Sequence, residues 1–204
     1  MRCCSTWRAA LRHDRCLIIY IHGFNSSPAS SKARLLHERL AALGRGDEFA
    51  APALPHGPAA ASKLLEALAR KHPHALLVGS SLGGYYATWL VEGFGMRAVL
   101  VNPAVRPYEL LAGHVGRQTN FHTGEAYDFT AQHVAELRAL EVATITPERY
   151  LLLAASGDEA LDYRQAVARY RGARQIVIDG GDHGFSAFAD HLDTVLAFAG
   201  MCRS

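Results

Sequence analysis

A serine at position 81 has the neighbours expected of a nucleophile. It lies in the pattern G-x-S-x-G, between Gly79 and Gly83, where an apolar strand-like run ends and a helical pattern begins. A serine exposed on such a tight turn needs small residues on either side, because the backbone packs closely there. Ser80 does not fit the pattern, since Val78 stands where its leading glycine would be. The pattern alone is equally consistent with a glycine-rich turn without chemistry, so the rest of the chain must decide.

An acid and a histidine follow the serine, each directly after a predicted strand. Asp158 lies in S-G-D-E after the run at 150–155, and His183 lies in G-G-D-H-G after the run at 175–179. A serine hydroxyl is a weak nucleophile, so it needs a base and a group that orients this base. The order serine, acid, histidine is the one that hydrolase triads at strand ends require. We therefore predict Ser81 as the nucleophile, His183 as the base and Asp158 as the acid that orients the imidazole.

Other acids and histidines provide the alternatives. Glu159 and Asp162 are the alternative acids, although Asp162 is expected one turn into the following helix. Asp182 is adjacent to His183, so we expect it to stabilise the loop rather than to orient the ring. The alternative for His183, one of 11 histidines, is a surface residue without a catalytic role. His22 follows a strand and precedes a glycine, and we expect it to brace its loop.

Two backbone N–H groups are placed to stabilise an oxyanion. Leu82 directly follows the serine at a helix start and is expected to offer the first. The loop at 22–25, after the first predicted strand, is expected to offer the second through Phe24. Candidate walls of the acyl pocket are aromatic residues of the segment 104–149: Phe121, Tyr127 and Phe129. Ordinary core packing is the alternative for all three.

Strands and helices alternate along the chain. Buried apolar runs predict strands at 16–21, 49–54, 75–78, 97–101, 150–155 and 175–179. Helical spacing predicts helices at 28–43, 60–71, 82–94, 128–140, 161–170 and 185–198, the first of them capped by Asn25 or Ser27. This alternation predicts an α/β fold: a mainly parallel sheet of about six strands, flanked by helices on both faces, with its ligand crevice at the carboxyl ends of the strands.

The domain organisation predicted from the sequence is simple. Residues 16–204 are expected to form a single domain in which 104–149 is a lid-like excursion, and residues 1–15 to be a flexible N-terminal extension. Four cysteines have neither zinc-ligand spacing nor the context of a disulfide framework, and we interpret them as incidental: Cys3, Cys4, Cys16 and Cys202.

Composition argues against several classes of partner. The 204 residues carry a formal net charge of +2, which gives no basic stripe for nucleic acid or an anionic membrane. No apolar run approaches the roughly 18 residues of a membrane span, and the start has no apolar signal-peptide core, so we predict a cytoplasmic protein. No H-E-x-x-H or similar spacing indicates a metal. We expect no cofactor and a small-molecule substrate, with the oligomeric state left open.

Beyond the triad, five segments resemble a known family. They are Y-I-H-G-F-N-S-S-P at 20–28, V-G-S-S-L-G-G-Y-Y-A-T-W-L at 78–90, V-N-P-A-V-R-P at 101–107, G-D-E-A-L-D-Y-R-Q-A-V at 157–167 and G-G-D-H at 180–183. Together they resemble the α/β-hydrolases, and more narrowly the YqiA-type bacterial esterases. The resemblance implies a small hydrolase with a reduced lid, active on acyl esters of modest chain length and on acyl thioesters.

These observations lead to a functional hypothesis. The chain is predicted to be a cofactor-free serine esterase that hydrolyses carboxylic esters through an acyl-enzyme. An acyl-CoA thioesterase or an acyltransferase on the same triad is the first alternative. These enzymes differ from an esterase only in the group that carries the acyl chain or in the nucleophile that resolves the acyl-enzyme. A catalytically silent binding protein with the same fold is the second, since fold does not dictate activity.

Overall fold

A computed structural model describes residues 16–201 of the chain. The expectations for residues 1–15, and for the three cysteines Cys3, Cys4 and Cys202, fall outside the described part. The main sheet contains six strands in the order β2-β1-β3-β4-β7-β8, and every neighbouring pair is parallel. Its strands are β1 Ile18–Ile21, β2 Phe49–Ala50, β3 Leu76–Ser80, β4 Arg97–Val101, β7 Tyr150–Ala155 and β8 Arg174–Ile178. The predicted six-stranded parallel sheet is therefore confirmed.

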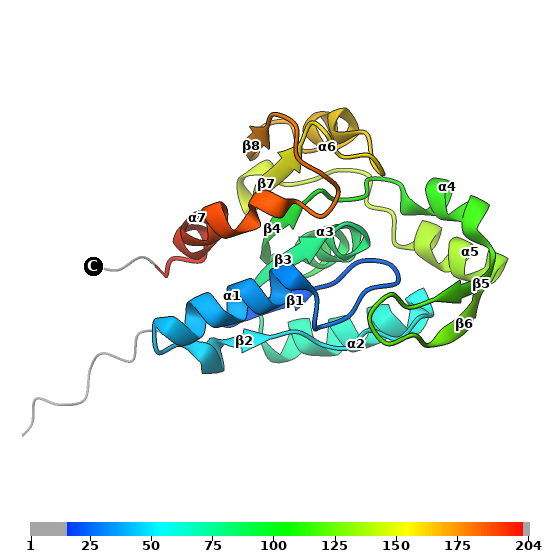
Figure 1. Ribbon diagram of the computed structural model, residues 1–204, viewed down its shortest axis with the longest axis horizontal. Helices are drawn as coiled ribbons and strands as arrows, with labels where there is room; N and C mark the ends of the chain where they lie inside the picture. The colour runs from blue at the N-terminus through cyan, green and yellow to red at the C-terminus, as the bar shows by residue number, and fades with distance from the viewer. Residues whose placement is uncertain (1–15, 202–204) are drawn as a thin grey trace, which may run out of the picture.

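Helices cover both faces of this sheet, as Figure 1 shows. They are α1 Ser31–Ala42, α2 Pro58–Lys71, α3 Leu82–Phe94, α4 Pro107–Leu111, α5 Ala131–Ala139, α6 Tyr163–Arg169 and α7 Leu192–Phe198. Short 3-10 turns lie at Gly46–Glu48, Ala112–His114, Pro147–Arg149 and Ser186–His191. Among the described residues, no helix combines the length and the apolar character needed to cross a membrane.

The pleat of the strands divides the core into two layers. Ile18 and Tyr20 face the layer that α1 and α7 cover, and Ile19 and Ile21 face the layer that α2, α3 and α6 cover. The central strands are apolar on both sides, as parallel strands between two helical layers must be. All six residues of β7 are buried. The two layers hold the carboxyl ends of the strands at one edge, where the loops with polar side chains begin.

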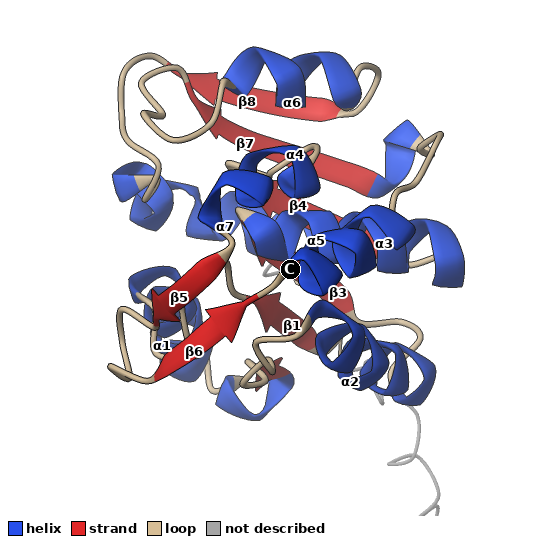
Figure 2. Ribbon diagram, turned by 90° about the vertical axis from the view of Figure 1, so that its right-hand side faces the viewer, coloured by secondary structure: helices blue, strands red, loops and turns tan. Residues whose placement is uncertain are grey.

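A small second sheet lies apart from the main one. Strands β5 Gly116–Thr119 and β6 Ala126–Phe129 form an antiparallel hairpin, seen separately in Figure 2. The sequence predicted a helix at 128–140 here, which is wrong at its start because β6 extends to Phe129. Thr130 then caps α5 by accepting the N–H of His133 through its side chain, at 3.3 Å. The excursion at 104–149 thus contains α4, the hairpin and α5.

Other predicted boundaries also need correction. The second strand is reduced to two residues, and the helix predicted over 185–198 begins as a 3-10 turn. The first helix begins at Ser31 rather than near Pro28, because Ser27 closes a turn through its hydroxyl and carbonyl oxygens, which accept the N–H groups of Ala29 and Ser30 at 3.1 Å. Asp162 lies at the N-cap of α6, one residue before the helix, and not within it.

Candidate active site

The turn after β3 holds Ser81 in a strained backbone conformation. Its φ is 54° and its ψ is −120°, a region that residues with a side chain rarely occupy. Gly79 and Gly83 on either side leave no room for a side chain. A Cβ on Gly79 would lie 2.5 Å from the carbonyl oxygen of Gly83, and one on Gly83 would lie 1.9 Å from that of Ile21. Close packing of β3, α3 and β1 therefore allows no other residue type at these two positions.

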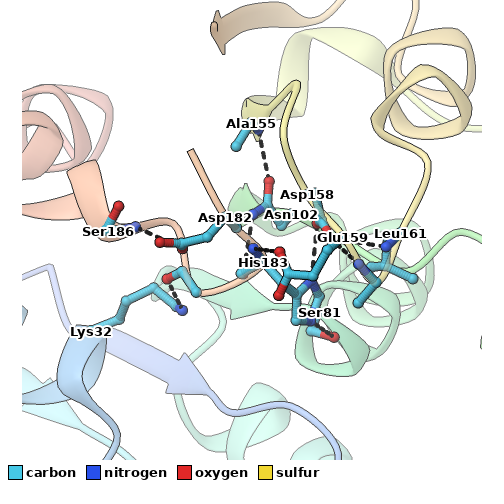
Figure 3. A network of polar contacts seen from close by, with 12 residues as sticks. Lys32, Ser81, Asn102, Ala155, Asp158, Glu159, Leu161, Asp182, His183 and Ser186 are labelled. Atoms are coloured by element: carbon cyan, nitrogen blue, oxygen red, sulfur yellow. Dashed lines mark hydrogen bonds and ion pairs between the residues drawn. The ribbon is translucent and has the colours of Figure 1, made fainter. Parts of the chain in front are cut away.

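Ser81, His183 and Asp158 meet at the carboxyl ends of β3, β8 and β7. The Oγ of Ser81 lies 3.1 Å from Nε2 of His183. The other ring nitrogen, Nδ1, lies 2.9 and 3.0 Å from the two carboxylate oxygens of Asp158. Figure 3 shows the three side chains in line. The arrangement is the one in which a histidine takes the proton of a serine while a carboxylate holds the ring.

Hydrogen bonds stabilise the ionised form of Asp158, although its side chain is only 1% exposed. Its Oδ1 accepts the backbone N–H groups of Ala160 and Leu161, at 2.9 and 2.8 Å. Burial by itself raises the pKa of this carboxyl, but the hydrogen bonds from His183 and from the two backbone N–H groups outweigh it, so the pKa of Asp158 lies below its usual value. The group therefore stays ionised at neutral pH beside the imidazole.

The alternative acids have other partners. Glu159 accepts the backbone N–H of His183 at 2.9 Å, and so supports the loop rather than the ring. Asp162 accepts the N–H of Arg164 at 3.0 Å as the cap of α6. Asp182 accepts the N–H of Ser186 at 3.2 Å within its own loop, as expected.

His22 braces its loop, in agreement with the expectation for it. Its Nδ1 lies 3.0 Å from the carbonyl oxygen of Gly23, and its Nε2 accepts the N–H of Leu54 at 3.2 Å. Burial lowers the pKa of His22, so the ring is neutral at pH 7. Both nitrogens are engaged with the backbone.

Asn102 is a site residue that the sequence reasoning missed. It lies at the end of β4 with a φ of 41°, and only 4% of it is exposed. Its Nδ2 donates to the carbonyl oxygens of Asp182 and His183, at 2.9 and 3.1 Å, while its Oδ1 accepts the N–H of Ala155 at 2.9 Å. In the sequence, the pair Asn102-Pro103 directly follows the predicted strand at 97–101, at the same sheet edge as the predicted triad.

Lys32 is a second support of the histidine loop. It reaches from α1 and donates from Nζ to the carbonyl oxygen of Gly184 at 2.6 Å (Figure 3). Burial lowers the pKa of Lys32, and the carboxylates of Asp182 and Asp158 oppose this effect. The loop that carries the histidine is therefore tied to α1 as well as to β4.

The two expected oxyanion donors lie in the turn after β3 and in the loop after β1. Leu82 begins α3, so its N–H has no acceptor within the helix. Phe24 lies in the loop after β1, and this loop passes close to the serine, because a Cβ on Gly23 would lie 3.2 Å from Cβ of Ser81. Leu82 is thus adjacent to Ser81 in the chain, and Phe24 follows a glycine whose backbone approaches Ser81.

The three aromatic candidates for the acyl pocket lie in different surroundings. Tyr127 lines a small pocket together with Phe24 and Leu82. Phe129 is only 1% exposed and packs edge-on behind the ring of Phe24, with 5.2 Å between centroids. Phe121 is 81% exposed at the tip of the hairpin. The structure brings Tyr127 to the pocket, and it leaves the other two side chains outside.

A larger cavity lies beside the loop that follows Asp158. It has a volume of about 210 Å³ and extends between α4 and the loop before α6, with Pro103 and Leu161 among its lining residues. Leu161 also donates to Asp158, and Ala104 donates to the carbonyl oxygen of Ser81 at 3.1 Å. The lining of this cavity is thus bonded to the candidate acid and to the backbone of Ser81. Within residues 16–201, no three histidine, cysteine or acidic side chains are grouped to hold a metal ion.

Comparisons with known proteins give the same fold. The sequence model of a family described as "Uncharacterised protein family (UPF0227)" matches residues 17–200. A UPF0227 protein of Vibrio campbellii is 25% identical over 188 residues, which cover 89% of this chain and 98% of that protein. Among solved structures, mouse alpha/beta hydrolase domain-containing protein 10 is similar with a TM-score of 0.63 and 17% identity, covering 88% of this chain and 89% of that one.

A structure from a study of LipS and LipT, two metagenome-derived lipolytic enzymes, is also similar. Its TM-score is 0.64 at 18% identity, and the match covers 92% of this chain and 94% of that one. The α/β-hydrolase fold predicted from the sequence is thereby confirmed.

Proposed function

This chain belongs to the UPF0227 family and has the α/β-hydrolase fold, and from this premise we propose that it is a serine hydrolase that cleaves carboxylic esters through an acyl-enzyme on Ser81. One observation carries the proposal. The Oγ of Ser81 lies 3.1 Å from Nε2 of His183, whose Nδ1 lies 2.9 Å from Asp158. The lipolytic enzymes with the same fold lend further support.

The proposed reaction begins with attack of Ser81 Oγ on the ester carbonyl carbon. The hydroxyl proton passes to Nε2 of His183, and Asp158 stabilises the imidazolium that forms. The carbonyl oxygen becomes an oxyanion that the N–H groups of Leu82 and Phe24 bind. The tetrahedral intermediate then expels the alcohol, which receives the proton from His183.

The second half of the reaction repeats these steps with water. His183 takes a proton from a water molecule, whose oxygen attacks the acyl carbon. The new tetrahedral intermediate collapses and releases the carboxylic acid, while His183 returns the proton to Oγ of Ser81. The proposed substrates are esters of modest acyl length, since the pocket beside Phe24 and Leu82 is small.

Labelling with a fluorophosphonate probe tests the nucleophile. The natural protein should be labelled, and Ser81→Ala should not. Ser80→Ala is the matched control, because this neighbouring serine is buried and lies outside the proposed triad. Labelling that persists in Ser81→Ala, or that disappears in Ser80→Ala with the protein still folded, contradicts the assignment.

Turnover of p-nitrophenyl butyrate and of butyryl-CoA by the same preparation then measures the preference for ester over thioester.

A further inference from the structure

We propose that the β5–β6 hairpin is a positioning element of this active site, which holds the loop after β1 so that the N–H of Phe24 faces the oxyanion formed at Ser81. The inference rests on the proposed function, because it concerns how that reaction is stabilised. The hairpin forms a sheet of its own and lies against the loop that follows β1 (Figures 1 and 2). Each residue of the loop from Phe24 to Ser26 is in contact with it.

Two hydrogen bonds fix the loop backbone. The N–H of Phe121 donates to the carbonyl oxygen of Asn25 at 2.9 Å. The Nδ2 of Asn120 donates to the carbonyl oxygen of Ser26, also at 2.9 Å. Asn120 is itself 6% exposed, and its Oδ1 accepts two N–H groups of the hairpin turn. The turn of the hairpin is therefore built around the side chain that holds the loop.

The side chain of Asn25 is bound at both ends by the hairpin. The hydroxyl of Tyr127 donates to Oδ1 of Asn25 at 2.6 Å, and Nδ2 of Asn25 donates to Oε1 of Gln118 at 3.1 Å. Burial raises the pKa of Tyr127 to about 12, so the phenol remains a donor at neutral pH. Asn25 is 7% exposed. Both of its polar atoms would lack partners without the hairpin.

The loop needs this support because its backbone is strained. Asn25 has a φ of 52°, in the left-handed region that few residues with a side chain adopt. It directly follows Phe24, so a change of its backbone angles would turn the peptide segment that passes Ser81. Strained residues persist only where their surroundings over-determine them, and they concentrate at functional sites. Here the surroundings are the side chains and backbone of the hairpin.

Packing adds to the hydrogen bonds. The ring of Phe24 meets the rings of Phe129 and Tyr127 edge-on, with centroids 5.2 and 6.5 Å apart. Phe121 engages the loop only through its backbone, while its side chain remains exposed. The hairpin therefore acts by holding the loop after β1, which carries the N–H of Phe24. It does not act by closing over the substrate as a lid.

The test is the variant Tyr127→Phe, which removes one hydroxyl and keeps the ring that stacks on His56 at 3.8 Å. We expect kcat for p-nitrophenyl butyrate to fall about 10-fold with KM within about twofold, because donors aimed at the oxyanion act mainly in the transition state. A trifluoromethyl ketone, which forms a tetrahedral adduct on the serine, should bind more weakly by about the same factor.

Tyr108→Phe is the matched control for this variant. It makes the same chemical change in α4, where the ring packs under the guanidinium of Arg138 at 4.4 Å and not against the loop. Its kcat should equal that of the natural enzyme. A kcat of Tyr127→Phe within twofold of the natural value, or a loss confined to KM, overturns the proposal.

A second pair of variants keeps the proposal testable if Tyr127→Phe does not fold. Asn25→Asp retains the acceptor for Tyr127 and loses the donor to Gln118, so it should keep more of kcat than Asn25→Ala. Natural kcat in Asn25→Ala overturns the proposal. The outcomes also separate it from the proposed function: absence of fluorophosphonate labelling in the natural protein refutes the hydrolase, whereas normal labelling with unaffected variants refutes only the role of the hairpin.

Discussion

The side-chain amide of Asn102 donates to the carbonyl oxygen of His183 at 3.1 Å, so the loop of the proposed base is bonded directly to a central strand. The same carboxamide accepts the N–H of Ala155 at the end of β7. One buried side chain thus connects the ends of β4 and β7 with the segment after β8. The position of the imidazole relative to Ser81 depends on this connection as well as on Asp158.

Replacing Asn102 should weaken both stability and turnover. Asn102→Asp keeps the acceptor for Ala155 but points a second oxygen at two carbonyl oxygens, so we expect the free energy of unfolding to fall by about 2–3 kcal/mol. Displacement of the imidazole should lower kcat by about 10- to 100-fold. Urea unfolding and ester kinetics measure the two effects. Asn102→Gly, which tolerates the φ of 41° and adds no charge, is the control and should be less destabilised. Natural stability in the aspartate variant would contradict the expectation.

The two adjacent acids should differ sharply in their effect on turnover. Asp158→Asn cannot stabilise the imidazolium and favours the wrong ring tautomer, so kcat should fall by about 10³- to 10⁴-fold, as for the corresponding change in other triads. Glu159→Gln keeps an oxygen that accepts the backbone N–H of His183, so its loss should be less than about 10-fold. Steady-state kinetics at pH 8 compares them. A larger loss in the Glu159 variant would move the role of the acid to that residue.

The stability of the protein should depend on the ionisation of Asp158 in acid. Its pKa is lowered in the folded state, so its contribution is fully present above the unfolded value of about 3.9 and is lost as pH falls through the lower folded pKa. The free energy of unfolding of the natural protein should therefore decrease with falling pH below about 4 more steeply than that of Asp158→Asn. Denaturant unfolding between pH 3 and 6 tests this, and parallel curves would show that the group does not contribute.

Two of the three glycines in α3 should respond in opposite directions when they are replaced by alanine: one replacement should lower the free energy of unfolding and the other should raise it. A Cβ on Gly83 would lie 1.9 Å from the carbonyl oxygen of Ile21, whereas one on Gly93 would have nothing within 4 Å. Gly83→Ala should lower the free energy of unfolding by more than about 3 kcal/mol, since β1 and α3 must separate. Gly93→Ala should raise it by about 0.5–1 kcal/mol through helix propensity. Thermal unfolding of both variants is the measurement, and a stable Gly83→Ala protein would contradict the close packing.

Much of the fold was predictable because buried parallel strands have a strong local signal. The run at 150–155 is continuously apolar, and the run at 97–101 is apolar after Arg97; both are strands with the predicted bounds. Ser81, Asp158 and His183 were identified because each follows such a run. Their relation in space could then be inferred from the geometry of parallel sheets alone. Assignment of their catalytic roles, and of the protein to the cytoplasm, stays a prediction.

The parts that were missed depend on contacts between distant segments. The strands of the hairpin are short and mostly exposed, so Ala126–Phe129 has no pattern that separates it from a helix start. Asn102 bonds to residues 80 and 81 positions later, which no local pattern reveals. The sequence suggests Asn25 only as a helix cap, because its preference for turns is visible there while its partners on the hairpin are not.

The strands that carry the three proposed triad side chains are synthesised at different times, and the strand before His183 is the last of them. Ser81 and His183 are 102 residues apart, and the strands before the three groups, β3, β7 and β8, lie in that order toward one edge of the sheet. The strained turn can form as soon as β1, β3 and α3 pack together, but the hydroxyl has no base until β8 joins the edge. Under the proposed mechanism, a nascent or truncated chain that lacks this strand has no base for Ser81. We therefore expect hydrolytic activity only after the whole sheet has formed.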